Sequence, residues 1–452
     1  MTNDKRLLGT APVGKLLFKL AVPTVLAQLI NMLYNIVDRI YIGHMPENGD
    51  LALTGVGVAM PIILIVSAFA TLVGSGGAPR ASIFMGQKDN ESAEKTLGTC
   101  LALQLLLSAV LTLVLLLWNR ELLIWFGASE NTVTYAVDYL KIYALGTLFV
   151  QLTLGMNAFI TAQGFTKASM LTVTVGAVTN IILDPIFIYG FGMGVKGAAL
   201  ATVISQAISA VWVMLFLFSS KSLLRIRLSH IRFAPKFLIP CVGLGLATFI
   251  MTSSDSIITG CFNTSLRKYG GDIAVGAMTI LSSVMQFAML PLSGIAQGAQ
   301  PILSYNYGAK NAERVKKTFR LLLLTCITYS VVLWSAIMLF PGAFVSLFTT
   351  KPDLASFAKG VIRIYLGAVF LFGIQIACQM TFVSLGKAAS SVSVAIMRKF
   401  VLLLPLIYLL PLFILNKTTA VYMAEPIADV IAVTYTSILF YFQFRKALRQ
   451  IS

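Results

Sequence analysis

The chain has 452 residues, of which 58% are hydrophobic and 11% are charged, and its net charge is +17. A typical soluble domain is about 45–50% apolar and about 25% charged. The composition therefore excludes a soluble enzyme, a disordered chain and a disulfide scaffold, and it predicts an all-α, polytopic membrane protein.

Apolar runs of about 20 residues, long enough to cross a bilayer as helices, recur along the chain. We expect about twelve membrane-spanning helices, at residues 16–42, 52–78, 96–118, 132–160, 168–189, 195–218, 237–262, 273–299, 318–340, 355–384, 389–413 and 420–444. The stretch between the sixth and seventh spans is basic. The predicted organisation is thus a first six-helix lobe (1–218), a cytoplasmic linker (219–236) and a second six-helix lobe (237–452).

Lysine and arginine are concentrated in the connections on one side of the predicted membrane. The loops that share a side with the two termini carry most of the 34 basic residues. Basic loops remain in the cytoplasm, so both termini are expected there. The distribution of basic residues over the loops accounts for the net charge, so we expect no nucleic-acid partner.

The two halves of the chain repeat at an offset of 222 residues. Ser82 matches Ser304, and Gly86 matches Gly308 in the same order of spans and loops. Because each half has an even number of spans, the repeats are predicted to be parallel and related by a pseudo-two-fold axis along the membrane normal. Two such lobes around a cleft favour alternating access over a simple pore.

Polar residues gather at one depth in the first lobe. At about 1.5 Å per helical residue, Tyr34 and Asp38 lie roughly 27 and 33 Å along the first span, and Asn180 and Asp184 roughly 18 and 24 Å along the fifth. Each pair is spaced i,i+4 and so shares a helix face. Thr202 lies in the outer half of the sixth span. Ionisable residues are costly within a membrane, so these are candidate functional residues.

These five side chains offer only oxygen ligands and an amide. Such a set suits Na⁺, bound through Asp38, Asn180 and Asp184, or a carboxyl group that burial keeps protonated. The alternative is hydrogen bonding between helices, with Arg39 as a counter-charge. At the 222 offset, Asn180 and Asp184 correspond to leucines, and this asymmetry favours a function over an architectural role.

The second lobe has a different polar set. Asp255 in the seventh span echoes Asp38, while Arg398 in the eleventh span and Glu425 and Asp429 in the twelfth reach the middle of the membrane. A buried structural ion pair and a second coupling or substrate site are both open interpretations.

No motif indicates catalysis or ATP hydrolysis. The segment Gly9–Lys15 matches a phosphate-binding loop only in part, because no strand precedes it and the Ser or Thr that holds Mg²⁺ is missing. The five cysteines lie in or beside apolar runs without a CxxC motif, and we expect packed, reduced thiols. The sequence predicts no catalytic residue and no cofactor.

Several segments together resemble the multidrug and toxic compound extrusion (MATE) transporters, particularly their bacterial multidrug-efflux branch, over essentially the whole chain. The matching segments are Leu20–Pro23, Tyr34–Asp38, Thr179–Pro185, Gly197–Thr202, Met397–Lys399 and Pro426–Asp429. The resemblance implies export of amphipathic, often cationic drugs in exchange for Na⁺ or H⁺. It also implies a cation site at residues matching Asp38, Asn180, Asp184 and Thr202, with Tyr34 nearby.

The expected location is the bacterial plasma membrane, with the lipid bilayer and small organic cations as partners and Na⁺ or H⁺ as the coupling ion. We expect a monomer that needs neither an ATPase subunit nor nucleic acid. One rival is a lipid-linked-oligosaccharide flippase of the same superfamily, which would favour a cationic cleft; Arg398 and Lys399 are its candidates. The other is a polytopic membrane enzyme, which would need clustered acids or histidines in the loops.

Overall fold

The computed structural model describes residues 7–45, 49–349 and 351–451, and the described chain is helical without strands. The N-terminal half contains α1 (Leu7–Thr10), α2 (Val13–Gly43), α3 (Gly49–Gly86), α4 (Asn90–Leu117), α5 (Asn119–Trp125), α6 (Val133–Leu145), α7 (Thr147–Ala162), α8 (Thr166–Pro185), the π-helix η2 (Ile186–Gly190) and α9 (Val195–Phe218). The 3₁₀ turn η3 (Leu228–His230) is the one helical element in the connection to the other half.

The C-terminal half begins with α10 (Pro235–Gly308) and α11 (Ala312–Leu339). It continues with α12 (Pro341–Ser346), α13 (Pro352–Tyr365), the 3₁₀ turn η4 (Val369–Leu371), α14 (Phe372–Ser384), α15 (Ala388–Ile396), the π-helix η5 (Met397–Leu403), α16 (Leu404–Phe413) and α17 (Lys417–Arg449).

Nine helical segments of the described chain are long and apolar enough to cross a membrane, and two bent pairs raise the number to eleven. The bent pairs are α6 with α7, which meet at 58°, and α13 with η4 and α14, which meet at 43°. The 74-residue α10 would be about 110 Å long if straight, several times the thickness of a bilayer. Gly271 breaks it with φ 65° and ψ −161°, a conformation suited to glycine. Dividing α10 there gives the expected twelve spans.

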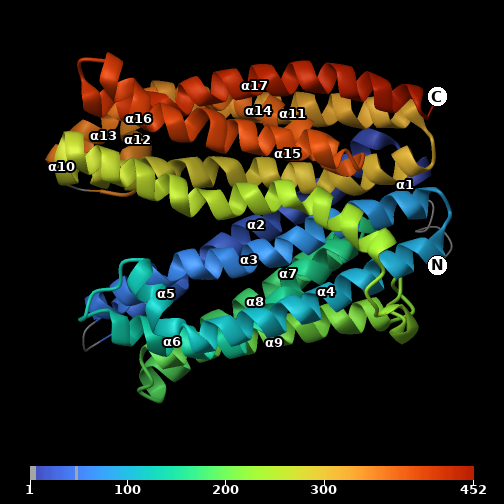
Figure 1. Ribbon diagram of the computed structural model, residues 1–452, viewed down its shortest axis with the longest axis horizontal. Coiled ribbons are helices and arrows are strands. Elements are labelled where there is room, and N and C mark those ends of the chain that lie inside the picture. The colour runs from blue at the N-terminus through green and yellow to red at the C-terminus, as the bar shows by residue number, and fades with distance from the viewer. Residues whose placement is uncertain (1–6, 46–48, 350, 452) are drawn as a thin grey trace.

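The helices form two bundles, one blue to green and one yellow to red in Figure 1. Local geometry repeats between them at the 222 offset. Ser82 Oγ donates to the carbonyl of Ala162 at 2.6 Å, and Ser304 Oγ donates to the carbonyl of Ser384 at 2.8 Å. The same bond thus joins the second and fourth spans of each bundle, as the repeat in the sequence predicts.

The two bundles contact each other at the end that carries α1 and the last turn of α17, and they diverge toward the opposite end (Figure 1). Thr24 Oγ1 of α2 donates to the carbonyl of Gly294 in α10 at 2.6 Å. A Cβ atom at Gly298 would lie 2.5 Å from the Cα of Ala21, so only glycine allows this approach. The rings of Phe69 on α3 and Phe249 on α10, with centroids 4.9 Å apart, also meet between the two bundles.

Candidate functional site

The polar residues predicted in the first lobe lie together in the structure, and we name this group the N-lobe cluster: Tyr34 and Asp38 on α2, Asn180 and Asp184 on α8, and Thr202 on α9. The three helices pack against one another. Asn180 and Asp184 have no exposed surface and Asp38 is 9% exposed, while Tyr34 and Thr202 are half-buried. The structure therefore brings together the five side chains that the i,i+4 spacing and the depth estimate single out.

Asn180 forms hydrogen bonds with two other members of the cluster. Its Nδ2 donates to Asp184 Oδ1 at 3.3 Å and to Thr202 Oγ1 at 3.5 Å. The carboxyl groups of Asp38 and Asp184 lie within hydrogen-bonding reach of each other. Two ionised carboxylates this close repel each other, so the pair favours a shared proton or a bound cation.

Three oxygens of the N-lobe cluster are buried without a hydrogen-bond partner: Asp38 Oδ1, Asn180 Oδ1 and Asp184 Oδ2. Buried acceptors are normally satisfied, so three of them on two adjacent helices need an explanation. Oxygen atoms of carboxylates and amides are the ligands that hard cations such as Na⁺ prefer. Among the described residues, no group of three His, Cys, Asp or Glu side chains is placed to hold a metal ion.

Two tyrosines of α6 lie beside the cluster, and the sequence did not predict them as site residues. Tyr139 is 4% exposed and its hydroxyl bonds with Thr202. Tyr143 stacks on Tyr139 with ring centroids 6.4 Å apart. Their i,i+4 spacing in one span was the available signal, but only the packing of α6 on α9 shows which helix they face.

One end of the cluster is shaped by η2, which directly follows Asp184 and Pro185. A π-helical turn widens the helix locally, and such turns are frequent at functional sites. Tyr189 in this turn donates to the carbonyl of Tyr41 on α2 at 2.6 Å. This bond ties α8 to α2 just beyond the two aspartates.

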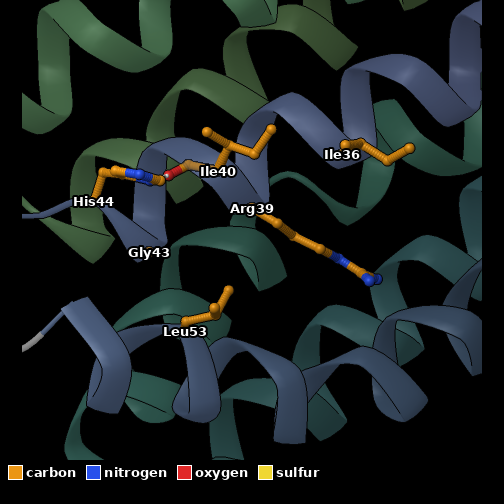
Figure 2. A pocket seen from close by; sticks show the side chains of 6 residues that line it. All are labelled: Ile36, Arg39, Ile40, Gly43, His44 and Leu53. Carbon is orange, nitrogen blue, oxygen red and sulfur yellow. Dashed lines mark hydrogen bonds between the residues drawn. The ribbon is translucent and has the colours of Figure 1, made fainter. Parts of the chain in front are cut away.

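Arg39, the counter-charge of the alternative interpretation, is exposed, and its guanidinium acts electrostatically on Asp38. Figure 2 shows its side chain extending into a pocket between α2 and α3, whose other lining residues are Ile36, Ile40, Gly43, His44 and Leu53. The alternative interpretation, with Arg39 as a counter-charge to Asp38, therefore keeps some support from the structure.

The second lobe holds a charged group that is paired throughout. Arg398 on η5 donates from Nε to Asp429 Oδ1 at 2.8 Å and from a terminal nitrogen to Glu425 Oε1 at 3.2 Å. Asp255 does not join this trio; its Oδ1 accepts from Lys399 Nζ at 2.7 Å. The trio is buried, whereas the Asp255 side chain is 61% exposed. Lys399 is the residue that the sequence interpretation did not assign to this group.

The two lobes therefore differ at equivalent positions. Leu402 and Leu406, which correspond to Asn180 and Asp184 at the 222 offset, pack against the apolar core of the second lobe. The second lobe balances its acids with cations, and the first leaves buried oxygens open.

Comparison with known proteins identifies the family. A family model described as MatE matches residues 23–186 and 244–409. The chain is similar to the multidrug export protein MepA of Staphylococcus haemolyticus (26% identity over 80% of this chain and 79% of the relative). It is also similar to MepA of Staphylococcus aureus strain NCTC 8325 (24% identity over 88% of each chain).

A solved structure described as MATE in the bent conformation superposes on this chain with a TM-score of 0.92 at 22% identity, covering 99% of each chain. The fold thus matches over the whole length, and the family model matches well over half of the chain. The chain is a multi-pass membrane protein that belongs to the multidrug and toxic compound extrusion family of transporters.

Proposed function

We propose that the chain is an antiporter that exports amphipathic organic cations in exchange for Na⁺ or H⁺, in the bacterial plasma membrane with both termini in the cytoplasm. The named relatives are multidrug export proteins, and the basic loops on the side of the termini support this orientation. In this orientation the lobes contact each other on the cytoplasmic side and diverge outward.

The three unpartnered oxygens of Asp38, Asn180 and Asp184 are the observation that carries the proposal. A Na⁺ ion would satisfy all three at once. A proton would instead be shared between the carboxyl groups of Asp38 and Asp184, which lie within hydrogen-bonding reach. Either ion removes the repulsion between the two acids, so the N-lobe cluster is a coherent binding site for one small cation.

Coupling requires that this cation bind the two conformations of the transporter with different affinity. The cluster is built from α2, α8 and α9, and α2 also bonds to the second lobe through Thr24 and Gly294. A cation that pulls Asp38 toward Asp184 therefore acts on the same helix that contacts the other lobe. Binding from outside would favour a conformation with low drug affinity, and release inside would reset the cycle.

The ion pairs of the second lobe give the flippase alternative no support. A cleft that holds a pyrophosphate group needs free cations, whereas Arg398 is bound by Asp429 and Glu425 and Lys399 is bound by Asp255.

Transport of ethidium by purified protein in liposomes tests the proposal, with a Na⁺ gradient and a proton gradient imposed in separate experiments. Movement driven by one gradient identifies the coupling ion. Asp184→Asn should abolish this movement while the protein still inserts and purifies normally. Asp353→Asn, an equal change at an exposed acid in the first turn of α13, should transport like the wild type. Gradient-driven transport by Asp184→Asn at the wild-type rate would refute the assignment of the site.

A further inference from the structure

Two cysteines from different lobes meet at the end of the molecule where the lobes touch. Cys100 lies on α4, and Cys241 lies near the start of α10. Neither forms a disulfide, and their exposed fractions are 0% and 1%. Both lie in one apolar core cluster, and the two thiols interact with each other.

The backbone of α3 holds this pair in place through two consecutive glycines. A Cβ atom at Gly77 would lie 2.5 Å from Cys100 Sγ, and one at Gly76 would lie 1.9 Å from the carbonyl oxygen of Cys241. Any larger residue at either position would push one cysteine away. Cys241 accordingly packs within the apolar core of the first lobe, although its helix belongs to the second.

A cation lies beside the two thiols. The Arg80 guanidinium acts electrostatically on both Cys100 and Cys241. It stacks on the ring of Phe84 at 5.6 Å, and its Nε is buried without a hydrogen-bond partner. Once the lobes part and water reaches the thiols, a neighbouring cation favours the thiolate, which is the form of cysteine that reacts with oxidants.

We propose that Cys100 and Cys241 form a reversible disulfide that locks the two lobes together at this end when the cell meets a peroxide. The inference rests on the proposed alternating access, because the thiols are shielded in the present conformation and become accessible only when the lobes part here. Of the described cysteines, Cys100 alone lies in the first lobe, and Cys241 is the cysteine that interacts with it.

The chemistry needs hydrogen peroxide as the one co-reactant. In the parted state one thiol attacks the peroxide, the O–O bond breaks, and the thiol becomes a sulfenic acid with release of one water. When the lobes close again, the other thiol attacks the sulfenic sulfur, forms the S–S bond and releases a second water. Two electrons and two protons thus pass from the two thiols to the peroxide. A thiol reductant reverses the link by exchange.

The test uses the full-length protein in liposomes, treated with hydrogen peroxide, alkylated and digested, with disulfides mapped by mass spectrometry. Ethidium transport is measured before oxidation, after oxidation and after dithiothreitol. We expect a Cys100–Cys241 peptide pair, loss of transport to background, and recovery with dithiothreitol. Cys100→Ala and Cys241→Ala should transport and resist peroxide, whereas Cys378→Ala, which removes a buried thiol within the second lobe, should remain sensitive.

Peptide mapping separates this inference from the proposed antiport. A protein that transports normally but forms no Cys100–Cys241 link under peroxide overturns the lock alone. The lock is also overturned if the link forms and transport is unchanged, or if peroxide inhibits Cys100→Ala and Cys241→Ala as strongly as the wild type. If the protein shows no gradient-driven transport before oxidation but forms the Cys100–Cys241 link under peroxide, the result supports the lock and counts against antiport.

Discussion

Arg314 on α11 holds the start of the chain against the second lobe. Its Nε donates to Asn306 Oδ1 at 3.0 Å, and a terminal nitrogen donates to the carbonyls of Leu8 and Ala11 at 3.1 and 2.8 Å. Asn306 Nδ2 also donates to the carbonyl of Leu8 at 2.9 Å. Because α2 follows Ala11 directly, this set of bonds connects the first lobe to the second at the end where the lobes meet.

We predict that Arg314→Ala shifts the conformational equilibrium toward the state in which the lobes part at this end. The variant loses three hydrogen bonds. At about 1 kcal/mol for each half-buried bond, the closed state loses about 3 kcal/mol. Since about 1.4 kcal/mol corresponds to a tenfold change, the ratio of parted to closed molecules should rise roughly a hundredfold. The carbonyl of Leu8 keeps its bond from Asn306, so the N-terminal helix stays attached in part.

Spin labels at Lys167 and Lys446, which are exposed on opposite lobes at this end, report the distance between the lobes by pulsed electron resonance. The distribution of distances should gain a longer component in Arg314→Ala. Arg320→Ala removes an exposed arginine from the same helix and should keep the wild-type distribution. Identical distributions in both variants would show that the Arg314 bonds do not stabilise the closed state.

Three further predictions concern stability and contact between the lobes. Arg398→Met should lower the free energy of unfolding by about 3–5 kcal/mol, because Glu425 and Asp429 are left buried and unpaired. Thermal unfolding in detergent measures this loss. Adding Glu425→Gln and Asp429→Asn to the variant should recover most of it. If the triple variant is stable but inactive in transport, the trio has a functional role. Asp89 caps the start of α4 by accepting from the Ser92 amide at 3.0 Å. Asp89→Ala should therefore lower the free energy of unfolding by about 1 kcal/mol, whereas Asp89→Asn should lower it little. Equal melting temperatures for the two variants would refute this role. Gly298→Ala should lengthen the distance between the lobes, because its Cβ would lie 2.5 Å from the backbone of Ala21; an unchanged distance distribution would contradict this.

The sequence predicts the spans and the N-lobe cluster because both depend on local patterns. Apolar length defines a span, and i,i+4 spacing with the estimated depth places Asp38 and Asp184 in one depth range. Other features depend on packing between distant segments. The π-helical turn after Pro185, the place of Tyr139 beside Thr202 and the pairing of Lys399 with Asp255 follow from which helices lie side by side. The 222 offset does not reveal them, because the lobes share a framework and differ in their polar residues.

This difference bears on how one lobe can respond to a cation while the other does not. In the second lobe, Arg398 already supplies the charge that Glu425 and Asp429 need, so an added small cation would meet no open acceptor there. In the first lobe, burial of Asp38 and Asp184 without a cation is unfavourable, because repulsion and unsatisfied oxygens both remain. A bound ion therefore changes the energy of the first lobe far more than that of the second. For the proposed antiport, this stabilisation shifts the transport cycle only if the ion binds the two conformations of the transporter with different affinity.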